Sequence, residues 1–102
     1  MNPERAHAYR RVIETLAELG PTKLQAAEQE RIRYTADNLI LCTDLLEDDP
    51  ARDSLEDTEL LCEVLVQSGR WERGTADRLI EALRACGPEL PRDLVASIPR
   101  AA

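Results

Sequence analysis

His7 is the only histidine in this chain, so at most one histidine base is available for nucleophilic catalysis. Triads of the Ser-His-Asp and Cys-His kinds need a histidine that a third group orients. His7 lies in the first turns of a predicted helix, where a surface side chain is the ordinary interpretation. Glu4 and His7 share the i, i+3 spacing of the metal-ligand pair in carboxylate-bridged di-iron bundles. Such a site needs the motif on two helices, and only a symmetric dimer would supply it twice.

Three cysteines, Cys42, Cys62 and Cys86, stand in apolar stretches of three different predicted helices. An odd number of cysteines without a CxxC spacing argues against a disulfide framework and favours a reducing compartment. A Cys3His zinc site needs all four ligands at one ion, but Cys62 would lie about 12 Å along the bundle from the level of the others. We therefore expect core cysteines and no cofactor. A metal-binding or redox bundle that uses His7 and the cysteines is the alternative.

Loops that hold phosphate or calcium are not recognisable in the sequence. The four glycines fall in neither the GxGxxG nor the GxxxxGK order. The acidic stretch fails the EF-hand pattern, because Leu46, Pro50 or Ala51 would take the third ligand position. Without a catalytic signature, we expect a protein that is not an enzyme.

Charge is concentrated in residues 44–59, which we call the acidic elbow. Its eight carboxylates and one arginine give it the same net charge as the whole chain, −7. Carboxylates at the start of a helix favour its dipole, and net charge aids solubility. The functional interpretation is a docking surface for a basic partner protein, with candidate contacts at Glu47, Asp48, Asp49, Asp53 and Asp57. An acidic inhibitor or nucleic-acid mimic, which docks into a basic protein groove through residues 44–59, is another alternative.

The overall composition narrows the class of function. The chain is acidic and its basic residues are scattered, which argues against binding to nucleic acid or to anionic membranes. The first dozen residues contain no apolar signal core, and no stretch reaches the roughly 18 apolar residues of a membrane span. We therefore expect a cytoplasmic protein. Twelve arginines against one lysine are typical of a GC-rich, bacterial genome.

Composition and periodicity predict an all-α fold in a single domain, residues 1–102. Apolar residues recur at helical spacing in four segments, residues 3–19, 23–46, 54–68 and 72–86. A short C-terminal helical turn is expected after Pro91. Four helices with short connections favour a compact up-down bundle, or two hairpins packed crosswise. Trp71, in the last connection, would close one end of the bundle.

Local signals predict where these helices begin and end. Thr22 and Gln25 have the spacing of a capping box for the second helix. Pro50 is expected to end that helix, because the residue before a proline disfavours helical dihedral angles. Asp53 or Ser54 is expected to cap the third helix.

Two of the predicted helices carry more apolar surface than one buried face needs. The second half of segment 23–46 and the run from residue 60 to residue 66 are apolar nearly all round, so they should lie centrally or be covered by a second copy. We therefore expect a homodimer, with an assembly face made of Leu41, Leu45, Leu60, Val64 and Val66. The function that we infer is a small non-enzymatic interaction or regulatory protein, which binds another protein or assembles with itself.

Overall fold

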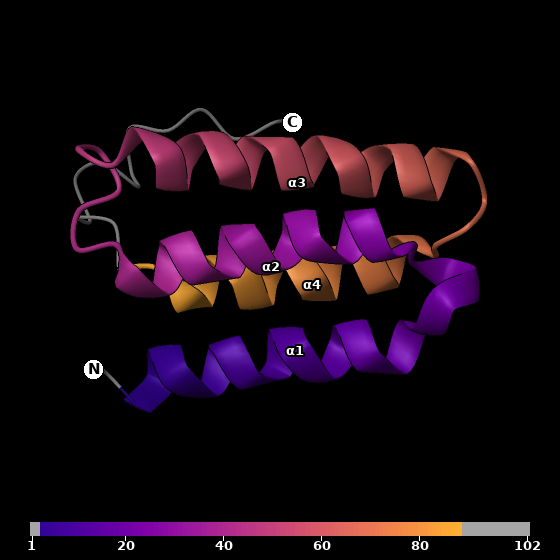
Figure 1. The fold of residues 1–102 in the computed structure, drawn as a ribbon, viewed down its shortest axis with the longest axis horizontal. Coiled ribbons are helices and arrows are strands. Elements are labelled where there is room, and N and C mark those ends of the chain that lie inside the picture. The colour runs from indigo at the N-terminus through magenta and orange to yellow at the C-terminus, as the bar shows by residue number, and fades with distance from the viewer. Residues whose placement is uncertain (1–2, 89–102) are drawn as a thin grey trace.

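The fold consists of four α-helices within residues 3–88, the part of the chain that the computed structural model describes. Their bounds are α1 Pro3–Lys23, α2 Ala26–Leu41, α3 Asp49–Gln67 and α4 Arg73–Cys86. Successive helices run in opposite directions and lie side by side (Figure 1). The prediction of an all-α bundle with four main helices is therefore confirmed. The helical turn expected after Pro91 lies outside the described residues.

The helices are arranged as a rhombus in which α2 and α4 form the short diagonal. Each of these two helices packs against the other and against both α1 and α3. In the described part of the chain, α1 and α3 do not contact each other. Figure 1 shows α2 in front of α4, with α1 and α3 on either side. Because α1 and α3 lie at the far corners, each has a broad outward side.

Aliphatic and small side chains fill the space between the helices. The chain has no phenylalanine, so leucine, isoleucine, valine and alanine make up most of the interior. Helical spacing brings these residues onto one side of each helix, where burial of apolar surface stabilises the bundle. The largest fully buried aliphatic side chains are Val12, Ile32, Leu39, Leu65, Leu79 and Leu83.

The first helix is longer than the sequence predicts, because Gly20 acts as a kink and not as a stop. Gly20 has a φ of 69°, a left-handed conformation that glycine adopts without steric cost. A further helical turn follows through Pro21. The capping box of α2 consequently starts at Gln25, whose backbone N–H donates to the Glu28 carboxylate over 2.9 Å. The predicted start of that box at Thr22 was wrong, since Thr22 belongs to the last turn of α1.

The second helix is shorter, and the third longer, than the sequence predicts. α2 ends at Leu41 instead of residue 46, and α3 begins at Asp49 instead of residue 54. In the loop between them, the Asp44 carboxylate accepts the backbone N–H of Leu46 over 3.0 Å. An aspartate that bonds the backbone two residues further on stabilises a turn in place of a helix.

The start of α3 shows why the predicted boundary was wrong. Asp48 caps the helix, because its carboxylate accepts the backbone N–H of Ala51 over 3.1 Å. Pro50 lies in the first turn of α3, where its missing N–H removes no helical hydrogen bond. It therefore marks the beginning of α3 and not the end of α2. The predicted caps, Asp53 and Ser54, lie inside the helix.

One end of the bundle, which we call the Arg5 end, is held by a guanidinium group that donates to main-chain carbonyls. Arg5 on α1 reaches the ends of α2 and α4. Its Nε donates to the Cys86 carbonyl over 2.7 Å. Its Nη2 donates to the carbonyls of Leu39 and Cys42 over 2.7 Å each, and to that of Ile40 over 3.2 Å. Because the last carbonyls of a helix have no helical donor, this side chain satisfies acceptors of two helices at once.

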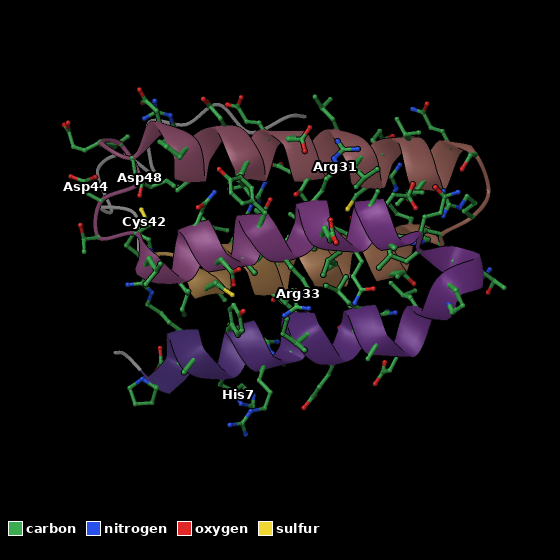
Figure 2. All side chains as sticks on the ribbon, viewed as in Figure 1. His7, Arg31, Arg33, Cys42, Asp44 and Asp48 are labelled. Atoms are coloured by element: carbon green, nitrogen blue, oxygen red, sulfur yellow. The ribbon has the colours of Figure 1, made fainter. Side chains whose placement is uncertain are left out.

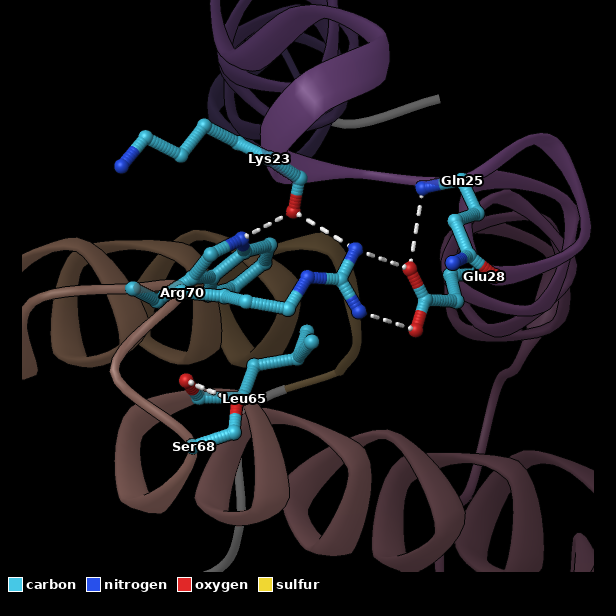
Figure 3. A network of polar contacts seen from close by, with 7 residues as sticks. Lys23, Gln25, Glu28, Leu65, Ser68 and Arg70 are labelled. Carbon is cyan, nitrogen blue, oxygen red and sulfur yellow. Dashed lines mark hydrogen bonds and ion pairs between the residues drawn. The ribbon is translucent and has the colours of Figure 1, made fainter.

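The opposite end, which we call the Trp71 end, is closed by a tryptophan and an ion pair (Figure 3). Trp71 is only 4% exposed, and its Nε1 donates to the Lys23 carbonyl over 2.8 Å. Arg70 donates to the same carbonyl over 3.2 Å and to both Glu28 carboxylate oxygens, over 2.8 and 3.0 Å. These contacts join the end of α1, the start of α2 and the α3–α4 connection. Trp71 therefore closes the bundle as predicted.

A polar layer lies inside the interface between α2 and α3. Thr35 and Thr58 are fully buried, and their hydroxyl oxygens are 2.7 Å apart. The Thr35 hydroxyl also lies 3.1 Å from the Arg31 carbonyl and 3.0 Å from the Ser54 carbonyl. Among the described residues, every buried side-chain nitrogen or oxygen has a hydrogen-bond partner. The layer fixes α3 against α2 and thereby determines which side of α3 faces outward.

Candidate functional site

Several carboxylates of the acidic elbow organise the loop and the first turn of α3. Asp44 and Asp48 accept backbone N–H groups, as described above, and Figure 2 shows both close to Cys42 at one end of the bundle. Asp49 forms an ion pair with Arg52, three residues further on. These three side chains therefore have structural partners within the elbow itself.

Two other elbow carboxylates are neutralised by arginines from neighbouring helices. Asp57 accepts two hydrogen bonds from Arg31 of α2, over 2.8 and 3.2 Å. Glu59 accepts one from Arg84 of α4, over 2.8 Å. The Asp57 carboxylate, by its hydrogen bonds, raises the pKa of the Arg31 guanidinium. Much of the charge that the sequence concentrates here is therefore balanced inside the fold.

The remaining elbow carboxylates, Glu47, Asp53 and Glu56, are exposed. Within residues 3–88 none of these three side chains forms a hydrogen bond or an ion pair. Glu47 and Asp53 were among the predicted contacts. Glu56 was not, although its position three residues after Asp53 places it on the same side of a helix.

The predicted assembly residues do not gather on one face. Leu41 on α2 is 77% exposed, and Leu60 and Val64 on α3 are 69% and 60% exposed. The remaining two, Leu45 and Val66, are half-buried and pack against the core. Sequence reasoning also missed two other exposed apolar side chains, Tyr34 and Leu46.

Free carboxylates and exposed apolar side chains form one continuous stripe on α3. Asp53, Glu56, Leu60, Val64 and Gln67 recur at spacings of three and four residues, and all five are exposed. Side chains at these spacings are neighbours along one side of an α-helix. We call this stripe the α3 outer face. It brings together residues from the predicted acidic elbow and from the predicted assembly face.

Ion pairs flank the α3 outer face on both sides. On the side of α4, Arg73 donates to Glu63 over 2.7 and 3.0 Å, and Arg84 donates to Glu59. On the side of α2, Arg31 binds the carboxylate of Asp57. Arg73, and after it the Gln67 amide, hydrogen-bond the Glu63 carboxylate and lower its pKa.

The ion pairs of two arginines on α4 differ from those that helical spacing suggests. That spacing would pair Arg73 with Asp77 and Arg84 with Glu81 on α4 itself. In the structure the hydrogen bonds of both arginines go to α3. The side chains of Asp77 and Glu81 are exposed and form no hydrogen bond with the described residues.

The three cysteines are buried, and their thiols are free of disulfides. Burial raises the pKa of Cys62 to about 12 and that of Cys86 to about 11. Burial, and next the Asp48 carboxylate, raise the pKa of Cys42. Because the thiolate is the reactive form, these thiols are poor nucleophiles near neutral pH. Among residues 3–88, no three His, Cys, Asp or Glu side chains are grouped in a way that could hold a metal ion.

His7 lies on the outer side of α1 and is exposed (Figure 2). It borders an open hollow of about 820 Å³ between α1 and the end of α4, which is also lined by Arg11 and Arg84. The hydrogen bond of Arg84 goes to Glu59. The fold therefore leaves the single imidazole without a neighbouring nucleophile among the residues that line this hollow.

A second apolar feature lies between α1 and α2. A hollow of about 400 Å³ is lined by Ala6, Tyr9, Asp37, Ile40 and Leu41. The Tyr9 hydroxyl donates to Asp37 over 2.6 Å, and this hydrogen bond is the main cause of the raised pKa of Tyr9. The exposed side chain of Leu41 stands at the rim. Tyr34, seven residues earlier, lies on the same side of α2.

Comparison with known proteins adds no relative to this picture. No protein-family model matches the chain, and no curated protein or solved structure matches it. Each helix within residues 3–88 is too short or too polar to cross a lipid bilayer.

Proposed function

We propose that this chain is a small non-enzymatic protein of the cytoplasm that acts by binding another protein through the α3 outer face. The observation that carries the proposal is the pair Leu60 and Val64, exposed at 69% and 60%, beside two carboxylates that have no partner among residues 3–88. Large apolar side chains that lie together on a surface, next to polar residues, are typical of interaction sites. The three free thiols are consistent with a reducing compartment.

The energetics favour a partner at this stripe over a purely solubilising role. Complete burial of a leucine or valine side chain contributes about 1.5–3 kcal/mol. Both apolar side chains lie on a helix that the Thr35–Thr58 layer holds in place, so a partner would meet a preformed surface. A stripe that served only to keep the protein soluble would need the carboxylates but not the exposed apolar pair.

Self-association through α2 is a second candidate, favoured by the 77% exposure of Leu41. Leu41 stands beside the apolar hollow between α1 and α2, so a second copy would cover both. A two-fold symmetric dimer uses the same surface on each copy and would bring two such hollows together. We propose a homodimer of this kind as the alternative to a partner protein on α3.

Native mass spectrometry of the protein purified gently from its own host separates these two candidates. We compare the wild-type chain with Leu60→Glu and Leu41→Glu. Both positions are exposed, so each variant should fold with a stability within about 0.5 kcal/mol of wild type. A charged residue in a buried contact should abolish binding. The proposal expects a complex with another protein in wild type and Leu41→Glu that is absent in Leu60→Glu.

The opposite pattern overturns the proposal. A homodimer that persists in Leu60→Glu and dissociates in Leu41→Glu would assign assembly to α2. A monomer in all three samples, without any bound protein, would contradict both candidates.

A further inference from the structure

The two halves of the α3 outer face differ in chemistry. The free carboxylates, Asp53 and Glu56, occupy the N-terminal half of α3, and the exposed apolar pair, Leu60 and Val64, occupies the C-terminal half. The centres of the two pairs are seven to eight residues apart, or about 11 Å along the helix axis. A partner that covers the whole stripe must therefore present two different chemistries in a defined order.

The flanking ion pairs disfavour a partner that places its cations over the apolar pair. Arg73, bound to Glu63, borders the C-terminal half of the stripe, and Arg31 and Arg84, bound to Asp57 and Glu59, border its middle. A lysine or arginine placed over the apolar pair would meet guanidinium groups and no free carboxylate. The same cation placed over Asp53 and Glu56 would meet two carboxylates that have no partner in the described part of the chain.

Helix dipoles favour one direction for a helical partner. Cations are favourable in the last turn of a helix and unfavourable in the first turn. If the partner runs antiparallel to α3, its C-terminal end lies over Asp53 and Glu56, so cations at that end suit both its own dipole and the carboxylates. In a parallel arrangement the cations would fall at its N-terminal end, where its dipole opposes them. Antiparallel helices also pack through ordinary ridges and grooves.

We propose that the occupant of the α3 outer face is an amphipathic helix that runs antiparallel to α3. Its apolar residues, four apart, cover Leu60 and Val64. Two arginines or lysines, seven to eight residues further toward its C-terminus, contact Asp53 and Glu56. This inference rests on the proposed function, because it names the partner chemistry of the same face.

Two synthetic peptides of identical composition test the direction of the helix. Both are acetylated and amidated and carry a fluorophore on a central residue. The first places the apolar pair before the arginine pair, and the second reverses this order. Fluorescence anisotropy with the full chain should give five- to tenfold tighter binding of the first peptide at low salt. This difference in affinity between the two peptides should shrink in about 0.5 M NaCl, because salt screens exposed charge contacts.

Matched variants of the protein locate the effect. Asp53→Asn together with Glu56→Gln should abolish the preference for the first peptide and leave apolar binding. Asp77→Asn together with Glu81→Gln makes the same change of charge on α4, where both carboxylates are exposed and form no hydrogen bond with the described residues, and should preserve the preference. Leu60→Glu should weaken both peptides.

The outcomes distinguish this inference from the proposed function. Equal binding of both peptides that Leu60→Glu removes would overturn the antiparallel arrangement and leave α3 as a docking face. Failure of both peptides, with a host complex that still depends on Leu60, would overturn the helical occupant alone. Failure of both peptides without any such complex would overturn the inference and the proposed function together. A preference that survives the Asp53/Glu56 variant would also overturn the inference.

Discussion

The two ends of the bundle are both closed by an arginine, but the acceptors differ in kind. At the Arg5 end, the guanidinium group donates to four main-chain carbonyls, which do not titrate. At the Trp71 end, Arg70 pairs with the carboxylate of Glu28, and an indole N–H shares the Lys23 carbonyl. The Arg5 end should therefore hold across a wide range of pH, whereas part of the Trp71 end depends on an ionised carboxylate.

Removing the buried indole of Trp71 should cause the largest loss of stability. Trp71→Ala should lower the free energy of unfolding by about 3–5 kcal/mol, because it leaves a cavity where the end of α1, the start of α2 and the α3–α4 connection meet. Trp71→Phe keeps most of the apolar volume and should cost about 1 kcal/mol, since the Lys23 carbonyl still accepts from Arg70. Urea unfolding followed by circular dichroism measures both. Similar losses for the two variants would mean that the hydrogen bond, and not the packing, closes this end.

Removing the Arg5 side chain should cause the next largest loss of stability. Arg5→Ala leaves carbonyl groups of α2 and α4 without this donor, and should cost about 2–3 kcal/mol. Arg10→Ala removes an exposed arginine that forms no hydrogen bond with the described residues, and should change stability by less than about 0.5 kcal/mol. Equal effects of the two substitutions in urea unfolding would show that the carbonyl contacts of Arg5 do not matter for stability.

The smallest loss of stability should come from removing the charge of Glu28, and it should depend on pH, unlike the loss at the Arg5 end. Hydrogen bonds from Arg70 hold the pKa of Glu28 below its ordinary value of 4.5, against the opposing effect of burial. A lowered pKa in the folded state contributes stability above that ordinary value, and the contribution is lost as pH falls through the lowered value. Glu28→Gln should therefore destabilise the protein at pH 7, by less than Arg5→Ala does.

At pH 3 the difference between wild type and Glu28→Gln should shrink, while the cost of Arg5→Ala should stay the same. Urea midpoints at the two pH values measure both trends. Glu30→Gln, on the same helix at an exposed position without a hydrogen bond to the described residues, serves as the control. A pH-independent cost of Glu28→Gln would contradict the role assigned to its charge.

The helical fold could be predicted because apolar periodicity survives in any packing arrangement. The buried stripes of α1 and α4 follow directly from spacing, as Val12 and Leu16 or Leu79 and Leu83 show. The boundary between α2 and α3 could not, because Pro50 is compatible with the end of one helix and with the first turn of the next. The hydrogen bond of Asp48 to the N–H of Ala51 decides between them, and it exists only in the folded loop.

The candidate site was less accessible to sequence reasoning than the fold. The sequence identifies the acidic elbow, but which carboxylates stay free depends on arginines from other helices. Arg31 lies 26 residues before Asp57, and Arg84 lies 25 residues after Glu59. No local pattern predicts contacts at such separations. Exposure of Leu60 likewise depends on α1 and α3 occupying opposite corners of the bundle.

The hydroxyl pair between α2 and α3 has a consequence for how the chain finds its alignment. Sliding α3 past α2 by a turn, about 5.4 Å, in the direction that brings the buried Leu61 and Cys62 level with Thr35, would separate the two hydroxyl groups. The Thr58 hydroxyl would then lose Thr35 as its partner, and a buried hydroxyl without a partner costs about 1–3 kcal/mol, whereas Thr35 would keep the Arg31 carbonyl of its own helix. Leucine and alanine contacts are nearly interchangeable between such alignments. The two threonines therefore disfavour this shifted alignment of α2 and α3, even where their hydrogen bond adds little to the stability of the native one.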